Sequence, residues 1–170
     1  MSKTLLAAAV LLAGTATAFA HATLEVQEAK VGSTYKAVMR IGHGCEGEAT
    51  LKVRVKIPEG VIAVKPMPKA GWTLETVKAP YAKTYDYYGT PLSEGVTEIV
   101  WTGELLDEHY DEFVFRARLT DGLPVDQVLY FPTVQECATK ADRWIEIPEA
   151  GKSADDYESP APGVMLKPKS

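Results

Sequence analysis

Histidine, cysteine and methionine are scarce in this sequence, and their scarcity limits the metal and redox chemistry that it can support. The 170 residues include three histidines, two cysteines and four methionines. The cysteines form no C-x-x-C motif and the methionines do not cluster with histidines, so a soft-ligand site for Cu(I) is not expected. No Ser-His-Asp set, paired-carboxylate signal or glycine-rich phosphate loop is recognisable, which disfavours a hydrolase or a nucleotide enzyme.

Basic clusters and long apolar runs are also missing. The formal net charge is −5, so the chain is a poor candidate for binding nucleic acid or an anionic membrane surface. The apolar run at residues 5–12 is too short to span a bilayer as a helix. No membrane anchor is therefore expected.

Residues 1–20 are typical of a secretory signal peptide. Lys3 supplies the positive charge, residues 5–12 supply the apolar segment, and residues 18–20 (AFA) have the small-x-small form that precedes cleavage. Cleavage after Ala20 leaves His21 at the amino terminus. Residues 16–18 (ATA) also allow cleavage after Ala18, which leaves His21 in third position. Whichever site is cut, the signal peptide predicts that the protein is exported, and we expect it in the periplasm.

A histidine at a free amino terminus predicts a site for Cu(II) or Ni(II). The α-amine and the ring Nδ1 of His21 can close one chelate ring on a single ion, and planar nitrogen ligands suit these two metals. An α-amine titrates at about 7.7 to 8.0 and an imidazole at about 6.5, so a metal displaces both protons readily near neutral pH. Copper binds such ligands more tightly than most first-row divalent ions. The alternative is a solvated, frayed chain end.

The two cysteines are Cys45 and Cys137. In an exported protein they are expected to form a disulfide. The long loop that this bond closes corresponds to roughly 4 to 5 kcal/mol of stabilisation in the chain-entropy model.

The chain after residue 20 reads as short strands separated by turns, with no amphipathic helical pattern. Residues 34–41 alternate apolar and polar, and residues 49–57 do so most strictly, with the apolar set from Leu51 to Ile57 facing inward. About eight or nine such strands predict an all-β sandwich of immunoglobulin-like or cupredoxin-like shape. Further segments with strand character lie at residues 23–29, 61–64, 73–78, 81–88, 96–102, 113–119, 125–135 and 144–147.

The domain organisation follows from this pattern. We expect one β-sandwich domain over residues 21–150. Residues 151–170 are polar and contain prolines, which predicts a mobile tail.

A series of short motifs runs through the whole chain after residue 20. They are H-A-T-L at residues 21–24, Glu28, Gly32, H-G-C at 43–45, P-x-x-x-x-G-W at 66–72, F-x-F at 113–115, Y-F-P at 130–132 and R-W-I-E at 143–146. In this order and spacing they resemble the YcnI-type copper-binding domain family, in the version of its proteobacterial branch.

The resemblance implies an exported β-sandwich that holds one Cu(II) in a mono-histidine brace. His21 would supply the amine and ring nitrogens, Glu28 a carboxylate, and Trp144 an indole beside the ion. Trp144 could instead be an ordinary aromatic packed at the sandwich edge. The other acids that could replace Glu28 are Glu46, Glu48 and Asp142.

Glu28 can reach the same ion as His21 only if the chain bends between them. In one continuous strand, residues seven apart point to opposite faces and their Cα atoms lie roughly 23 Å apart. The bend is expected at Val26 or Gln27.

The number of available histidines distinguishes a copper monooxygenase from a protein that only binds copper. A two-histidine copper monooxygenase needs a second ring nitrogen, which only His43 in a tight turn or His109 in an acidic loop could supply. We therefore expect Cu(II) binding and copper trafficking, with delivery to a periplasmic Cu(I) chaperone or a membrane importer, rather than catalysis. The alternatives are a brace-type copper oxidase and a metal-free adhesion or assembly domain.

Overall fold

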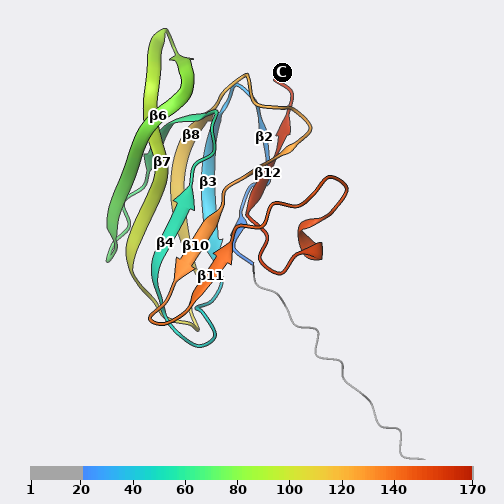
Figure 1. The fold of residues 1–170 in the computed structure, drawn as a ribbon. Helices are drawn as coiled ribbons and strands as arrows, with labels where there is room; N and C mark the ends of the chain where they lie inside the picture. Colours follow the sequence, from blue (N-terminus) through green and yellow to red (C-terminus); the bar gives the residue numbers. More distant parts are fainter. Residues whose placement is uncertain (1–20, 170) are drawn as a thin grey trace, which may run out of the picture.

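The computed structural model describes residues 21–169 and shows a β-sandwich (Figure 1). The expected signal peptide lies outside these residues. The strands are β1 (Thr23–Leu24), β2 (Glu28–Lys30), β3 (Thr34–Ile41), β4 (Thr50–Lys56), β5 (Val61–Pro66), β6 (Thr73–Tyr87), β7 (Thr90–Leu105), β8 (Asp111–Leu119), β9 (Val128–Tyr130), β10 (Thr133–Glu136), β11 (Ala141–Trp144) and β12 (Gly163–Lys167).

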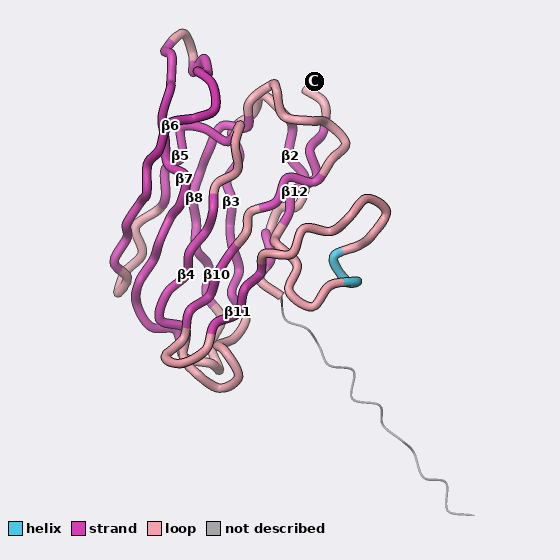
Figure 2. The backbone as a smooth tube through the Cα atoms, viewed as in Figure 1, coloured by secondary structure: helices cyan, strands magenta, loops and turns pink. Residues whose placement is uncertain are grey.

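The strands form two main layers and a smaller sheet. One layer has the order β1-β3-β8-β5, the other has the order β11-β10-β4-β7-β6, and the small sheet has the order β2-β12-β9. Figure 1 shows the small sheet beside the sandwich, near the point where the described chain begins. Within residues 21–169 the only helix is the short 3-10 turn η1 (Ala154–Asp156), in a loop outside the sheets (Figure 2).

The core forms because the alternating residues of the two layers face each other. Strand β3 has the bounds predicted from the sequence, and its partner β8 pairs with it along its length. Phe113 and Phe115 of β8 meet Trp101 of the opposite layer and Phe131, and all four side chains are completely buried. Each aromatic side chain of this size removes a large apolar area from water, and this burial stabilises the fold.

Strand β4 departs from the strict alternation that the sequence predicts. Val53, Val55 and Ile57 are buried, but Leu51 is exposed to 36%. The register between β4 and β7 shifts between Thr50 and Lys52, and Thr50 is buried in place of Leu51. A bulge at the end of a strand rotates the side chains on one side of it, so the prediction for Leu51 is wrong.

Several predicted strands have different bounds. The last one, predicted at residues 144–147, is displaced toward the amino terminus, since β11 is Ala141–Trp144, and four others are divided or joined. Residues 23–29 divide into β1 and β2, and residues 125–135 divide into β9 and β10. The two strands predicted at residues 73–78 and 81–88 instead form the single long strand β6 (Thr73–Tyr87), which joins β7 through a hairpin. The hairpin turn is Tyr88-Gly89, with φ of 53° and 83°, as a two-residue type I′ turn requires.

The predicted mobile tail is wrong. Residues 163–167 form β12, which pairs in parallel with β2 and antiparallel with β9. Val164 and Leu166 are completely buried. Two buried aliphatic side chains and two backbone ladders outweigh the polar composition around them, so the domain extends to the end of β12 rather than to residue 150.

The predicted disulfide is present. Cys45 and Cys137 are bonded, with Cα atoms 6.1 Å apart. Cys45 also begins a tight turn in which Glu46 and Gly47 both have positive φ, and its backbone exchanges two hydrogen bonds with Glu48. Within residues 21–169, no helix has the length and apolar character needed to cross a bilayer.

Candidate functional site

His21 lies against Trp144. The imidazole and indole centroids are 5.7 Å apart, with the ring planes inclined at 60°. Trp144 is buried, and His21 is half-buried with its Nε2 atom shielded from solvent. The structure therefore brings together two of the three residues that the family resemblance implies for the metal site.

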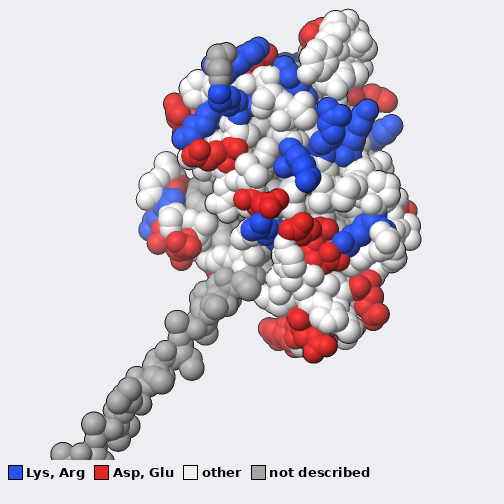
Figure 3. All heavy atoms as spheres, turned by 180° about the vertical axis from the view of Figure 1, so that it is seen from behind, with Lys and Arg blue, Asp and Glu red and all other residues white. Residues whose placement is uncertain are grey.

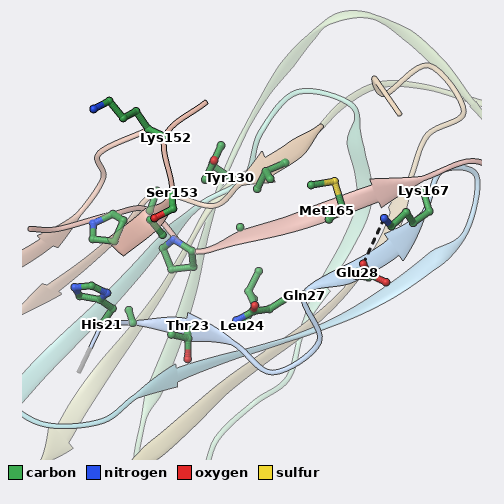
Figure 4. Close-up of a pocket in the computed structure, with 17 residues that line it drawn as sticks. His21, Thr23, Leu24, Gln27, Glu28, Tyr130, Lys152, Ser153, Met165 and Lys167 are labelled. Atoms are coloured by element: carbon green, nitrogen blue, oxygen red, sulfur yellow. Dashed lines mark ion pairs between the residues drawn. The ribbon is translucent and has the colours of Figure 1, made fainter. Parts of the chain in front are cut away.

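His21 also lines a pocket of about 490 Å³. Its walls come from β1, the bend after β1, β9, β12, and residues 152–154 and 160–162 of the loop before β12. Figure 4 shows His21 at one end of this pocket, with Leu24, Gln27 and Met165 between it and the far end. A pocket of this size is far larger than a metal ion and is within the range of small-molecule sites.

The loop over this pocket is closed at its base by Glu146. The Glu146 amide donates to Ser159 (3.1 Å), the Ala161 amide donates to the Glu146 carbonyl (2.8 Å), and the Ser159 amide donates to the Glu146 carboxylate (2.6 Å). The 3-10 turn in the loop has a capping box between Ser153 and Asp156. Local hydrogen bonds thus hold residues 147–159 in place beside the pocket, although the sequence predicts a mobile tail from residue 151.

The chain bends between His21 and Glu28, as predicted. The Glu25 amide still donates to Val38 of β3 (3.0 Å), whereas the Gln27 carbonyl accepts from Met165 of β12 (2.7 Å). The hydroxyl of the buried Tyr35 donates to the Val26 carbonyl between them (2.5 Å). The main chain thus changes from the first layer to the small sheet at Val26. The Tyr35 hydroxyl that holds this point is buried, and burial raises its pKa.

The bend does not bring Glu28 to the histidine. The Glu28 carboxylate forms an ion pair with Lys167 at 3.4 Å. Figure 4 shows this pair at the end of the pocket opposite His21, with the Glu28 side chain directed toward Lys167. Strand β2 pairs with β12 in a register that places Glu28 opposite Met165, two residues before Lys167 on the same face of the strand.

The other acids expected as alternatives lie near the disulfide turn. Glu46 pairs with Lys140 (2.6 Å), and Glu48 accepts hydrogen bonds from Thr139, which lower the pKa of its carboxyl. Asp142 is on β11 two residues before Trp144, so both side chains lie on the same face of that strand. Burial raises the pKa of the Asp142 carboxyl, and the nearby His43 partly opposes this.

The remaining histidines do not line the pocket. His43 lies in the turn before Cys45, where its ring contacts the Gly44 carbonyl. His109 is exposed and lies 3.8 Å from the Glu108 carboxylate. The pocket therefore presents one imidazole, that of His21.

The donor set at His21 fits a two-nitrogen chelate rather than a site enclosed by side chains. Within residues 21–169, no group of three or more histidine, cysteine, aspartate or glutamate side chains is placed to hold a metal ion. Acidic and basic side chains are interspersed on the face shown in Figure 3. A metal held here depends on the main-chain nitrogen of His21, which becomes an amine only when the preceding peptide bond is cut.

Sequence reasoning missed Gln135. This glutamine is buried to 1% exposure in β10, and its Oε1 accepts a hydrogen bond from the Trp144 indole at 3.3 Å. Because glutamine is polar, the alternation of apolar and polar residues in the sequence does not mark this position as buried. Its contact with Trp144 is apparent only in the folded structure.

The match to known families begins at the same histidine. A family described as a domain of unknown function (DUF1775) matches residues 21–166. The chain belongs to this family. The matched region starts at His21 and ends within β12, so it includes Trp144 and all the residues that line the pocket except Lys167.

The fold has a relative among solved structures. An uncharacterized protein from Nocardia farcinica with an immunoglobulin-like fold is 22% identical to this chain, with a TM-score of 0.63. The likeness covers 86% of this chain and 98% of the other. At this identity it shows the fold alone, and it confirms the predicted immunoglobulin-like sandwich. No curated protein matches this chain significantly.

Proposed function

We propose that this DUF1775 domain is an exported Cu(II)-binding protein of the YcnI type, which holds the ion at the amino terminus exposed by cleavage after Ala20. The observation that carries the proposal is the contact between His21 and the buried Trp144 at the end of the pocket. The family match begins at the same residue.

The chemistry of the chelate accounts for the choice of metal. The α-amine and the Nδ1 atom of His21 bind one ion as a bidentate nitrogen ligand, and nitrogen ligands in one plane suit Cu(II). Cu(II) bound there would complete its coordination with solvent or a carboxylate. Glu28 and Asp142 are the two acids to compare, the first from the family resemblance and the second from its position on the same face of β11 as Trp144.

The surroundings favour binding over catalysis. The Trp144 ring excludes water from one side of His21, and its π face can contribute to holding a cation. A single imidazole does not provide the three-nitrogen arrangement of two-histidine oxygenases. We therefore assign the protein to copper homeostasis in the periplasm, where it would capture Cu(II) and pass copper to a Cu(I) chaperone or a membrane importer.

Titration of the processed protein with Cu(II) tests this proposal. We expect one equivalent to bind, with EPR of the ¹⁵N-histidine-labelled protein showing one ring nitrogen, and we expect His21→Ala to abolish this signal. The matched control is His109→Ala, which should bind as the wild type does. Equal binding by both variants would refute the site, and peroxide production with a reductant would favour the copper oxidase instead.

A further inference from the structure

Gln135 is a buried polar residue that contacts Trp144, the residue against which His21 lies, and both polar atoms of its side chain have protein partners. Its Nε2 donates to the His43 carbonyl at 2.6 Å and to the Thr50 hydroxyl at 2.8 Å. Its Oε1 accepts from the Trp144 indole at 3.3 Å. One side chain thus connects strands β4 and β11 with the turn before Cys45.

The orientation of the amide is determined by these partners. Turning the group over would place its NH₂ against the Trp144 N–H and its oxygen against the His43 carbonyl. Two donors or two acceptors facing each other in a buried site are strongly unfavourable. The Trp144 indole is therefore held by an acceptor whose own position is fixed at two other points.

The disulfide holds the other end of this arrangement. Cys137 follows Gln135 by two residues, and the Cys45 sulfur lies 3.8 Å from the Gln135 carbonyl oxygen. The disulfide thus holds the His43 to Cys45 turn against the strand that carries Gln135. The path from this crosslink to His21 consists of Gln135 and Trp144.

We propose that Gln135 is a positioning residue for the amino-terminal metal site: it fixes the indole of Trp144 in the orientation that contacts His21. The inference rests on the proposed function, because His21 is the ligand whose position is controlled. Gln135 itself does not bind the ion. Groups that orient metal ligands from outside the coordination sphere typically change metal affinity by about 10- to 100-fold when removed.

The first test uses the metal-free processed protein, so that it does not depend on copper. NMR of the wild type should show a slowly exchanging Trp144 indole proton and an NOE between the Trp144 and His21 rings. Gln135→Met, which keeps the shape but removes the hydrogen bonds, should shift the indole resonance and weaken the NOE. The matched control is Gln127→Met, since Gln127 is exposed.

The second test is a double-mutant cycle for Cu(II) affinity. Gln135→Met should raise the Kd about 10-fold in the wild-type background, but by less than about twofold when Trp144 is already phenylalanine. An equal effect in both backgrounds would show that Gln135 acts on the fold in general and would overturn the proposal. A rapidly exchanging Trp144 indole proton in the wild type would also overturn it, even if Gln135→Met does not fold.

The two proposals fail in different ways. A wild-type protein that does not bind Cu(II) refutes the proposed function, whatever the NMR shows. A wild-type protein that binds Cu(II), together with an unchanged ring contact in Gln135→Met, refutes only the role of Gln135.

Discussion

The imidazole of His21 meets the indole of Trp144 edge to face, with centroids 5.7 Å apart. Such ring pairs contribute about 0.5 to 1.5 kcal/mol beyond the area that they bury. Because Trp144 is buried and hydrogen-bonded to Gln135, it holds the start of the domain against the sandwich. After the proposed cleavage, this contact would hold the new amino terminus beside the pocket.

Tryptophan fluorescence should report copper through this contact. Cu(II) at His21 should quench Trp144 strongly, because quenching requires close approach of the ion. We expect Trp144→Phe to lose most of the Cu(II)-dependent quenching. Trp101→Phe should retain it, since Trp101 is completely buried and donates to the Met67 carbonyl. Equal residual quenching in both variants would remove Trp144 from the site.

Glu28 should matter little for copper in this arrangement. Its carboxylate is paired with Lys167 at the far end of the pocket, and an exposed ion pair contributes at most about 1 kcal/mol. We expect Glu28→Gln to change the Kd for Cu(II) by less than about threefold, measured by competition with a chelator. A loss as large as that of His21→Ala would show that the terminal segment moves to bring Glu28 to the ion.

Ionisation of the Asp142 carboxyl should lower the free energy of unfolding of the wild-type protein as the pH rises. Burial raises the pKa of its carboxyl, so the folded state binds this proton more tightly than the unfolded state. The penalty for ionising Asp142 is absent well below its ordinary pKa and complete above its raised pKa. Asp142→Asn should therefore gain stability relative to wild type between pH 3 and pH 7, by about 0.5 kcal/mol or less, in urea unfolding at both pH values. A relative loss over this interval would contradict the account.

The strand after the loop should be essential for folding. Leu166 of β12 is completely buried, whereas Leu106 is 45% exposed. We expect Leu166→Ala to lower the free energy of unfolding by about 2 to 5 kcal/mol and Leu106→Ala to change it by about 0.5 kcal/mol or less. Chemical denaturation measures both, and equal small effects would restore the prediction of a mobile tail.

Much of the sandwich could be predicted from the sequence because its strands have one wet face. Residues 34–41 show this alternation, and they form β3 with the predicted bounds. The disulfide was predicted from two cysteines in a chain that we expected to be exported, and it is present. The bend near Val26 was expected because the family resemblance requires His21 and Glu28 to reach one ion. The chain does change sheets there, but Glu28 remains at the far end of the pocket.

The features that the sequence did not predict depend on contacts between residues that are far apart in the chain. Val164 and Leu166 are flanked by prolines, lysines and acids, and their burial depends on pairing with β2, far away in the sequence. Glu28 has the position that the family resemblance implies, but the parallel register with β12 directs it to Lys167. Gln135 is inward-facing because β10 lies between β4 and β11, which no window of the sequence reveals.

The most direct test of the account compares two forms of the same domain, one beginning at a free His21 and one beginning at an acetylated His21. Acetylation leaves the imidazole in place but removes the amine from the chelate. We predict that the form with the free His21 amine binds Cu(II) at least about 100-fold more tightly than the acetylated form, a difference of about 2.7 kcal/mol. Equal affinity of the two forms, measured by chelator competition, would contradict the central claim.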